Sequence, residues 1–431
     1  MNTNKNILLA FYGDDFTGST DALEFITRAG TNAVLFIEPP TPQQLQKFSG
    51  LDVIGVAGKT RALPPAEMEK ILLPAFEQLR ETGAQQVHYK VCSTFDSSIT
   101  TGSIGKAIDC GSIVFKNKII PVLGGMPALG RYCVFGNLFA QMGIGSNGKI
   151  YRLDKHPSMS KHPITPAHES DLSLHLGKQT NKKFGLIDVL QIDKSVDEFD
   201  NIFKDEEVIL IDALYESQLL NIGRWLDKLG SDSTQFSVGG SGIEAALGDV
   251  WNEKRIVNRR DEWNAIERIN PMLVISGSCS PVTAAQVEWA KANGFEEVIV
   301  DALKVCNDGS ICGSVNEIVK NILNKAHNVI VHTGAKQEKN LSSEKLGTAL
   351  GTIAKEAVMY TSVRRVVVAG GDTSSYVVRA MEIDAVKMIA PLVSGAPLCR
   401  AYSANKRIDG LEGNFKGGQV GTENYFGLAI G

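Results

Sequence analysis

Short apolar runs rich in β-branched residues alternate with longer helical patterns along this chain. In the first half, Asn6–Tyr12, Val53–Ala57 and Gln86–Val91 have the character of buried strands, whereas Pro65–Glu81 has the period of an amphipathic helix. The alternation begins again at Pro271–Ser276. It predicts an α/β protein with two domains, each a mainly parallel sheet flanked by helices. Further strands are predicted at Ala33–Ile37, Ile119–Val122, Val208–Ile211, Glu297–Val300, Asn328–His332 and Arg365–Ala369.

The chain is too long for a single domain. Its 431 residues exceed the roughly 250–300 that one hydrophobic core supports. We therefore expect a first domain over residues 1–250 and a second over residues 271–431. The charged stretch 251–270 shows little hydrophobic periodicity. It is either a linker or a solvated helix between the domains, and the sequence leaves both readings open.

Charge and cysteine usage exclude several classes of protein. There are 44 basic and 48 acidic side chains and no basic block, which disfavours binding to nucleic acid or an anionic membrane. The seven cysteines are scattered and form no CxxC pair, which favours a reducing compartment. The apolar run Ile7–Tyr12 is too short for a signal peptide or a membrane span. We expect a cytoplasmic protein.

Two aspartates follow the first predicted strand. Asp14 and Asp15 lie between Gly13 and Gly18, at the carboxyl end of a strand, where open α/β sheets bind ligands. A cap at Ser19 or Thr20 would explain one polar residue here, but not the doubled carboxylate. Adjacent carboxylates raise one another's pKa, which suits a general base or a ligand for a metal or a hydroxyl.

A second polar cluster follows the strand Gln86–Val91. It combines a cation, a carboxylate and several hydroxyls, the groups that bind a polyol or an acid sugar, and its main members are Lys90, Ser93, Thr94, Asp96 and Ser97. Lys90 would supply positive charge for a substrate carboxylate. Asp96 either accepts hydrogen bonds from substrate hydroxyls or merely caps a helix that starts near Ser98.

Three hydroxyl-rich or glycine-rich turns in the second half suit phosphate binding. Two of them join a strand to a helix, where backbone N–H groups form a phosphate cradle. They predict a nucleotide site, although a sugar phosphate or a dinucleotide would fit similarly. The candidate residues are Ser278, Ser280, Gly371, Asp372, Thr373, Ser374, Lys416, Gly418 and Gly421.

One glycine pattern is discounted. The stretch from Gly143 to Gly148 matches GxGxxG, and Gly143–Lys149 matches the start of a P-loop. Neither lies between a strand and a helix, and Ile150 stands where a P-loop needs Ser or Thr. We interpret this stretch as a simple turn.

Several motifs in sequence order resemble the four-carbon acid sugar kinase family, and the resemblance covers nearly the entire chain. They are DDFTG at Asp14–Gly18, Arg61, YKxxST at Tyr89–Thr94, HPxTP…ESDL at His162–Leu172, GGSG at Gly239–Gly242, SGSCSPVT at Ser276–Thr283 and GGDTS at Gly370–Ser374. The resemblance implies an N-terminal acid-sugar domain, a C-terminal ATP domain and a reaction in the cleft between them. It implies ATP contacts from Ser278, Ser280, Gly371–Ser374 and the C-terminal glycine-rich loop.

Two stretches depart from the family pattern. Members commonly carry arginine and glycine after the Ser-Thr pair, where this chain has Phe95 and Asp96. The glycine-rich loop is also altered, at Lys416–Gly421. Losing an arginine that grips a carboxylate with two hydrogen bonds should change which acid is accepted. The pattern resembles a branch that acts on branched or oxo acids such as 3-oxo-isoapionate, with D-threonate, D-erythronate and 3-oxo-tetronate as alternatives.

The resulting hypothesis is an ATP- and Mg²⁺-dependent kinase that phosphorylates the terminal hydroxyl of a small sugar acid. Asp15 is predicted to orient or deprotonate that hydroxyl, with Asp14 and Asp96 as alternatives. Arg61 and Lys90 are expected to face the substrate carboxylate, and Lys416 the phosphates. A homodimer is possible, and the metal ligands are not predicted. The competing hypotheses are an NAD-dependent sugar-acid dehydrogenase or isomerase, whose GxGxxG is missing from the required context, and a non-catalytic sugar-acid binding protein.

Overall fold

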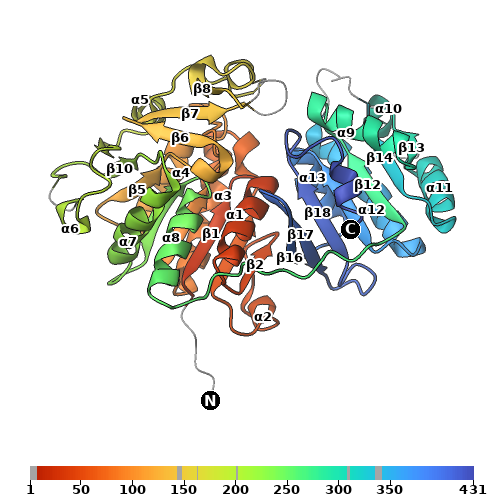
Figure 1. Ribbon diagram of the computed structural model, residues 1–431, viewed down its shortest axis with the longest axis horizontal. Helices are drawn as coiled ribbons and strands as arrows, with labels where there is room; N and C mark the ends of the chain where they lie inside the picture. Colours follow the sequence, from red (N-terminus) through yellow and green to blue (C-terminus); the bar gives the residue numbers. More distant parts are fainter. Residues whose placement is uncertain (1–6, 143–147, 163, 200–201, 308–310, 335–341) are drawn as a thin grey trace. The chain divides into compact units, whose positions relative to one another are not determined.

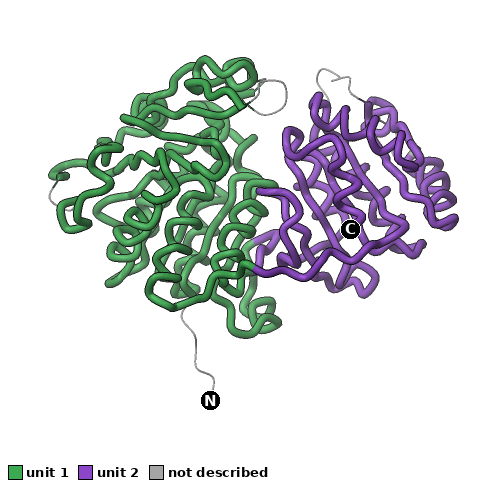
Figure 2. The backbone as a smooth tube through the Cα atoms, in the orientation of Figure 1, with its two compact units in different colours: residues 1–33, 39–261 green, residues 34–38, 262–431 purple. Residues whose placement is uncertain are grey.

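The computed structural model describes residues 7–142, 148–162, 164–199, 202–307, 311–334 and 342–431. The chain forms two compact units, shown in Figure 2. Unit 1 comprises residues 1–33 and 39–261, and unit 2 comprises residues 34–38 and 262–431. A short N-terminal segment therefore groups with the C-terminal half of the chain.

Unit 1 is built on a parallel sheet, of which strands β1, β5 and β10 are labelled in Figure 1. Its strands are, in spatial order, β3 (Val53–Ala57), β1 (Leu9–Gly13), β4 (Gln86–Lys90), β11 (Gln235–Gly239), β5 (Ile120–Leu123), β10 (Val208–Ile211) and β9 (Phe184–Ile187). All but β9 are buried along their whole length, as expected for parallel strands covered by helices on both faces. The helices are α1 (Phe16–Arg28), α2 (Pro42–Leu45), α3 (Pro65–Glu81), α4 (Ile104–Phe115), α5 (Leu172–Gly177), α6 (Val196–Phe199), α7 (Leu219–Leu229) and α8 (Gly242–Glu253).

A small antiparallel sheet lies beside the carboxyl ends of these strands. It consists of β6 (Arg131–Val134), β7 (Asn137–Gln141) and β8 (Ile150–Arg152). Asp212, just after β10, accepts hydrogen bonds from the backbone N–H groups of Phe135 and Gly136 and so ties the β6–β7 turn to the main sheet. The sequence patterns did not predict these strands. The turn expected from Gly143 falls on residues 143–147, which lie outside the described residues.

Unit 2 combines parallel and antiparallel strands. The parallel part has the order β13 (Glu296–Ile299), β14 (Val329–His332), β12 (Met272–Ser276), β15 (Arg365–Ala369) and β18 (Glu412–Lys416). The antiparallel strands β17 (Ala396–Tyr402), β16 (Ala385–Val393) and β2 (Ala33–Phe36) continue it. The helices are α9 (Pro281–Ala292), α10 (Ala302–Asn307), α11 (Ile311–Asn324), α12 (Ser343–Tyr360), α13 (Gly371–Ala380) and α14 (Tyr425–Leu428).

The predicted α/β class and most predicted elements are confirmed. Val53–Ala57, Val208–Ile211 and Arg365–Ala369 are strands with the predicted bounds, and Pro65–Glu81 is a helix with the predicted bounds. The charged stretch after α8 contains no helix, since no regular element occurs between Glu253 and β12. The antiparallel strands after Ala369 were not predicted, because their alternation is interrupted by register shifts between β16 and β17.

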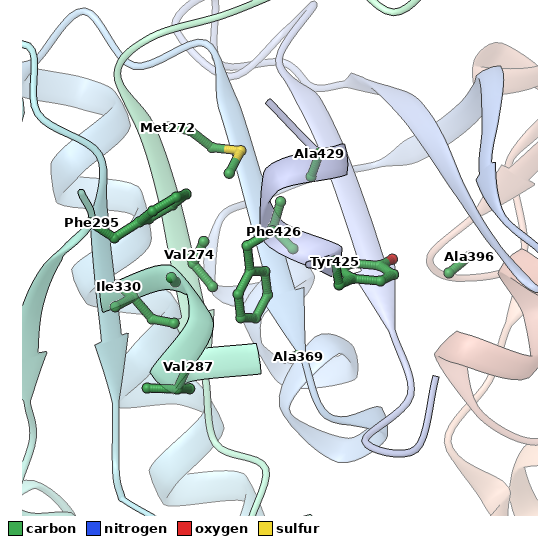
Figure 3. Packing of buried hydrophobic residues seen from close by; sticks show 12 residues of the cluster. Met272, Val274, Val287, Phe295, Ile330, Ala369, Ala396, Tyr425, Phe426 and Ala429 are labelled. Carbon is green, nitrogen blue, oxygen red and sulfur yellow. The ribbon is translucent and has the colours of Figure 1, made fainter. Parts of the chain in front are cut away.

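The core of unit 2 includes the C-terminal helix. Figure 3 shows Tyr425 and Phe426 of α14 packed with Met272, Val274 and other buried residues of the sheet and α9. The Tyr425 hydroxyl donates to Asn414 Oδ1 at 2.7 Å, so its one polar atom is satisfied within the core.

The Arg365 side chain bonds the last residues of the chain to the start of β15. Its buried guanidinium pairs with Glu412 and donates to the backbone carbonyls of Glu267, Ala429 and Ile430. Arg365→Met should lower the free energy of unfolding by about 3–5 kcal/mol, because the Glu412 carboxylate loses its counter-charge and three carbonyls lose their donor. Urea denaturation followed by circular dichroism measures the change.

The neighbouring residue provides a matched control. Arg364 has a largely exposed side chain and lies 3.6 Å from the Glu267 carboxylate. Exposed ion pairs contribute little, so Arg364→Met should change the free energy of unfolding by less than about 1 kcal/mol. Equal losses in the two variants would contradict the role given to Arg365.

Candidate active site

The carboxyl ends of the unit 1 strands lie level with one another. Gly13 of β1 is in register with Lys90 of β4, and Lys90 is in register with Gly239 of β11. Residues that follow these strands therefore meet at one edge of the sheet. The predicted acidic pair and the predicted hydroxyl cluster both follow strands of this set, so the fold brings them together.

Asp15 is the N-cap of α1. Its Oδ1 accepts from the backbone N–H of Gly18 at 2.9 Å, and its Oδ2 accepts from the Thr17 hydroxyl at 2.8 Å. The same oxygen lies 2.8 Å from Arg61 Nη2. Burial alone would raise the pKa of Asp15, but Arg61 and Lys90 outweigh it and hold the pKa below its usual range. Asp15 is thus an ionised residue with both oxygens engaged.

The cap at Ser19 or Thr20, considered as an alternative explanation of this motif, is not present. Helix α1 begins at Phe16, before both residues. The cap is therefore Asp15, because it is the residue that precedes the first helical turn. Ser19 instead donates its hydroxyl to the Asp15 carbonyl at 2.6 Å.

Asp14 differs from its neighbour. It is 3% exposed, and its Oδ1 is buried and accepts no hydrogen bond from any described residue. Its Oδ2 receives one long bond, 3.4 Å, from the Cys92 backbone N–H. Burial and the adjacent Asp15 charge raise the pKa of Asp14 to about 7. Asp14 is therefore a carboxylate with a free oxygen that exchanges its proton near neutral pH.

Lys90 forms an internal ion pair. Its side chain is 1% exposed and its Nζ lies 3.2 Å from Asp21 Oδ2, which also accepts from the Ser241 hydroxyl at 2.7 Å. Burial lowers the pKa of Lys90, yet the surrounding acidic groups, with Asp21 the largest contributor, together outweigh burial and raise the pKa above its usual value. Lys90 holds its charge beneath the acidic pair, with a carboxylate already bound.

The segment after β4 forms an irregular loop. Thr94 donates to Asp96 Oδ1 at 2.8 Å, and the Ser97 hydroxyl lies 2.9 Å from His175 Nε2. Phe95 adopts φ of 53°, a left-handed conformation that turns the chain between them. No helix starts near Ser98, since α4 begins at Ile104 with Ser103 as its cap. The cap role considered for Asp96 is therefore wrong, because the helix starts too far along the chain.

In unit 2 the predicted turns also meet. Ser276 of β12 is in register with Ala369 of β15, which is in register with Lys416 of β18. The Gly370 N–H donates to the Lys416 carbonyl at 2.9 Å, and the Thr283 hydroxyl donates to the Gly418 carbonyl at 2.9 Å. The three turns thus form one continuous surface.

Two glycines make this close approach possible. Gly370 has φ of 122°, which favours glycine, and a Cβ there would lie 2.8 Å from Thr373 Oγ1. A Cβ on Gly418 would lie 2.7 Å from Ser278 Oγ. Gly370 precedes α13 and offers no side-chain cap, so the first N–H groups of that helix remain available to a ligand.

Lys416 is buried beneath this surface. Its Nζ donates to Thr283 Oγ1 at 3.2 Å and lies 5.5 Å from the centre of the Tyr425 ring. No carboxylate of the described chain pairs with it, and burial lowers its pKa to about 7. The remaining predicted residues differ in position: Ser280 caps α9, Asp372 is exposed on α13, and Gly421 packs against Tyr425.

A pocket of about 230 Å³ lies in unit 2 beside these turns. It was not predicted from the sequence. Residues of β12, α9 and the end of β14 line it, and they are Ser276, Ser278, Ala284, Ala285, Val287, Glu288, His332 and Gly334. Its mixed polar and apolar walls are typical of sites for small ligands.

Sequence reasoning missed several partners of the predicted residues. Asp21 lies three residues beyond the DDFTG motif and Ser241 lies inside GGSG, but only folding places them beside Lys90. Thr283 belongs to SGSCSPVT and holds Lys416. Arg131 carried no signal at all, since it follows an ordinary turn.

Clustered hydroxyls and carboxylates at the strand ends of one unit, and glycine- and hydroxyl-rich turns before helices in the other, are features of a two-domain phosphotransferase that acts on a carbohydrate. Comparison with known families gives the same class. Residues 9–247 match the sugar-binding N-terminal domain, and residues 273–426 match the nucleotide-binding C-terminal domain. The chain belongs to the four-carbon acid sugar kinase family, and it is an ATP-using sugar-acid kinase with an alcohol group as acceptor.

Curated relatives align over nearly the whole chain. A 3-oxo-isoapionate kinase of Paraburkholderia graminis is 38% identical over 98% of this chain and 94% of its own length. A 3-oxo-tetronate kinase of Pseudomonas savastanoi is 28% identical over 99% of this chain and 97% of its own.

Solved structures share the fold. A crystal structure from Salmonella typhimurium LT2 has a TM-score of 0.79 at 24% identity and covers 98% of both chains. One from Haemophilus influenzae has a TM-score of 0.71 at 23% identity, covering 97% of this chain and 98% of its own. Within the described ranges, none of the helices has both the length and the apolar character that crossing a bilayer requires.

Proposed function

We propose that this kinase transfers the γ-phosphoryl group of ATP to the terminal hydroxyl of a branched sugar acid, with 3-oxo-isoapionate as the first candidate. The observation that carries this proposal is the 38% identity to a 3-oxo-isoapionate kinase over 98% of the chain. The replacement of the family's usual arginine and glycine by Phe95 and Asp96 agrees with a substrate other than a plain four-carbon acid. D-threonate, D-erythronate and 3-oxo-tetronate are the alternatives.

We assign acid binding to residues 1–250 and nucleotide binding to residues 271–431. Phosphoryl transfer depends on positioning and charge neutralisation more than on covalent chemistry by the protein. The free oxygen of Asp14, with its pKa near 7, supports Asp14 as the group that accepts the hydroxyl proton. Asp15 would hold the turn after β1 in place through its ion pair with Arg61 and the hydrogen bond that it accepts from the first turn of α1.

The hydroxyls and Asp96 of the loop after β4 would bind the hydroxyl groups of the acid. Ser93 is half-buried beside Gly240. The Asp96 carboxylate accepts a hydrogen bond from the Thr94 hydroxyl, so the loop contains both donors and acceptors. An acid with more hydroxyls can use more of them, which supports a branched substrate.

In unit 2, the first N–H groups of α13 and the hydroxyls of Ser278 and Ser280 would bind the phosphates. Lys416 would balance their charge from below. The pocket between β12, β14 and α9 would take the adenine ring, because it adjoins Ser278 and has apolar walls.

Mg²⁺ would enter with the nucleotide. Among the described residues, no three His, Cys, Asp or Glu side chains gather as a metal site. This fits Mg²⁺, which usually keeps several waters and binds through substrate phosphates with few protein carboxylates. Bound with the nucleotide, the ion would neutralise negative charge on the phosphates.

A panel assay tests the proposed function. Release of ADP is measured with Mg²⁺–ATP and each of the four acids, with a reaction lacking acid as the control. We expect 3-oxo-isoapionate to give the highest kcat/KM and the control to give little ADP. If kcat/KM for D-threonate or D-erythronate is ten times that for 3-oxo-isoapionate, the assignment to a branched acid is wrong. If no acid stimulates ADP release, the proposed reaction is wrong.

A further inference from the structure

The two cations expected to bind the substrate carboxylate already have carboxylate partners. Arg61 Nη2 lies 2.8 Å from Asp15, and Lys90 Nζ lies 3.2 Å from Asp21. Because each charge is balanced inside the protein, a substrate carboxylate would have to compete with an internal ion pair. A sugar-acid kinase therefore needs another cation at this edge of the sheet.

Arg131, at the start of β6, has the properties that this additional cation requires. It forms no ion pair with any described carboxylate, and its Nε is buried without a hydrogen-bond partner in the described part of the chain. Its Nη1 donates to the carbonyls of Leu129, Gly130 and Gln141, at 2.9, 3.3 and 3.4 Å. These neutral oxygens fix the guanidinium from one side. The edge formed by Nε and Nη2 makes no hydrogen bond within the described part of the chain. A carboxylate would grip this edge with two parallel hydrogen bonds once the residues that cover Nε move aside.

Arg131 also lies at the correct edge of the sheet. Its backbone pairs with Met126, which follows the carboxyl end of β5. β5 adjoins β11 and β11 adjoins β4, the strand that leads into the hydroxyl loop.

The charges around Arg131 place it beside the acid site as well. Burial lowers the pKa of its guanidinium, and the three ionisable groups that act most strongly against this are Cys92, Asp96 and Asp21, followed by Tyr132. The first three belong to the cluster that follows β4 or supports Lys90. Arg131 is thus half-buried, only partly balanced in charge and surrounded by charges of the residues that would bind the acid.

We propose that Arg131 binds the carboxylate of the sugar acid and so replaces the arginine that this chain lacks at the Phe95–Asp96 position. The inference rests on the proposed function, because it concerns the acid bound in that reaction. Recognition would come from a different element, the β6 strand, so the carboxylate would bind from the side of β5 and leave Asp96 to the hydroxyls. Loss of a charge-assisted pair of hydrogen bonds should weaken acid binding by about 10- to 100-fold.

The test compares two ligands that differ only in the carboxylate. D-erythronate and the neutral polyol erythritol have the same four-carbon chain, and NMR titration measures millimolar binding without requiring turnover. In Arg131→Met, the dissociation constant for D-erythronate should rise about 10- to 100-fold, toward that of erythritol, while erythritol binding changes less than twofold. Arg131→Lys keeps the positive charge and should retain part of the preference for D-erythronate over erythritol.

A matched control comes from the same small sheet. Arg152 of β8 carries an exposed guanidinium already paired with Asp154 at 2.6 and 2.7 Å. Arg152→Met should leave both dissociation constants within twofold. If Arg131→Met weakens both ligands equally, Arg131 only supports the turn, and the proposal is wrong. It is also wrong if D-erythronate binding is unchanged or absent in the wild-type protein. Acid binding that depends on Arg131 without any ADP release would contradict the proposed reaction and leave the carboxylate site intact.

Discussion

Asp14→Asn is expected to lower kcat by about 10²–10⁴-fold, the range that general base catalysis contributes. Asparagine has the same shape but cannot accept the hydroxyl proton, and the free Oδ1 of Asp14 has no structural partner to lose among the described residues. The KM for ATP should stay within twofold, because the residue belongs to unit 1. Steady-state kinetics with the preferred acid measures both values.

The adjacent aspartate is the matched control. Asp15→Asn should lower kcat by no more than about tenfold, since asparagine still caps a helix and the losses are the ion pair with Arg61 and the hydrogen bond from the Thr17 hydroxyl. The sequence alone predicts Asp15 as the base, whereas the unpaired oxygen of Asp14 favours Asp14. If Asp15→Asn loses more turnover than Asp14→Asn, the original assignment is correct and the role proposed for Asp14 is wrong.

The pH profile adds an independent readout. The pKa of Asp14 is raised to about 7, so the carboxyl is protonated in the free enzyme below that pH and cannot act as a base. In the wild-type protein, kcat/KM for the acid should therefore fall as the pH decreases through about 7. The apparent pKa belongs to the Asp14–Asp15 pair, because the two groups titrate together. Asp14→Asn should remove this limb of the profile.

Lys416→Met is expected to lower kcat/KM for ATP by about 10²–10³-fold, the usual cost of losing one group that stabilises developing charge. Lys416 is fully buried. Among the described residues, its ammonium group contacts the Thr283 hydroxyl and the face of the Tyr425 ring. Its pKa of about 7 means that it is mostly neutral at pH 8 before the nucleotide binds. The phosphates should then draw a proton onto it.

Calorimetry detects that proton directly. Titrating Mg²⁺–ATP at pH 8 in two buffers with different heats of ionisation should reveal an uptake close to one proton per nucleotide. The uptake should vanish near pH 6, where Lys416 is already charged, and in Lys416→Met. Lys355→Met is the control, because that lysine lies on α12 and is paired with Glu382 at 2.6 Å. Equal proton uptake in wild type and Lys416→Met would rule out this role.

The same residue links stability to pH. The folded-state pKa of Lys416 lies below its ordinary value, so the unfolded chain binds more protons between about pH 7 and 10. Its contribution to stability is therefore lost as the pH falls through this window. Lys416→Met should accordingly raise the thermal midpoint relative to wild type at pH 6. A lower midpoint would indicate that the ammonium has a partner that stabilises it.

Local patterns predicted much of the site because chemistry and secondary structure coincide there. Asp14 and Asp15 follow a strand of five buried residues, and a parallel strand that is covered on both faces is apolar throughout and easily seen. The turns at Ser278 and Gly371 were found for the same reason, since each joins such a strand to a helix. The antiparallel strands and the small sheet of β6 lack this signal.

The sequence by itself determined the α/β class, the strand-end turns that carry the polar residues and the kinase family. Only the tertiary structure decided which of these residues are free to act. The sequence alone does not distinguish Asp14 from Asp15. In the structure, Asp15 is paired with Arg61 and caps α1, whereas Asp14 has one oxygen without a partner among the described residues. Lys90 is paired with Asp21, whereas Arg131, which follows a turn without a motif, has a buried Nε without a partner among the described residues. The physical reason is that burial and pairing set the charge and availability of a side chain, and both depend on residues far away in sequence.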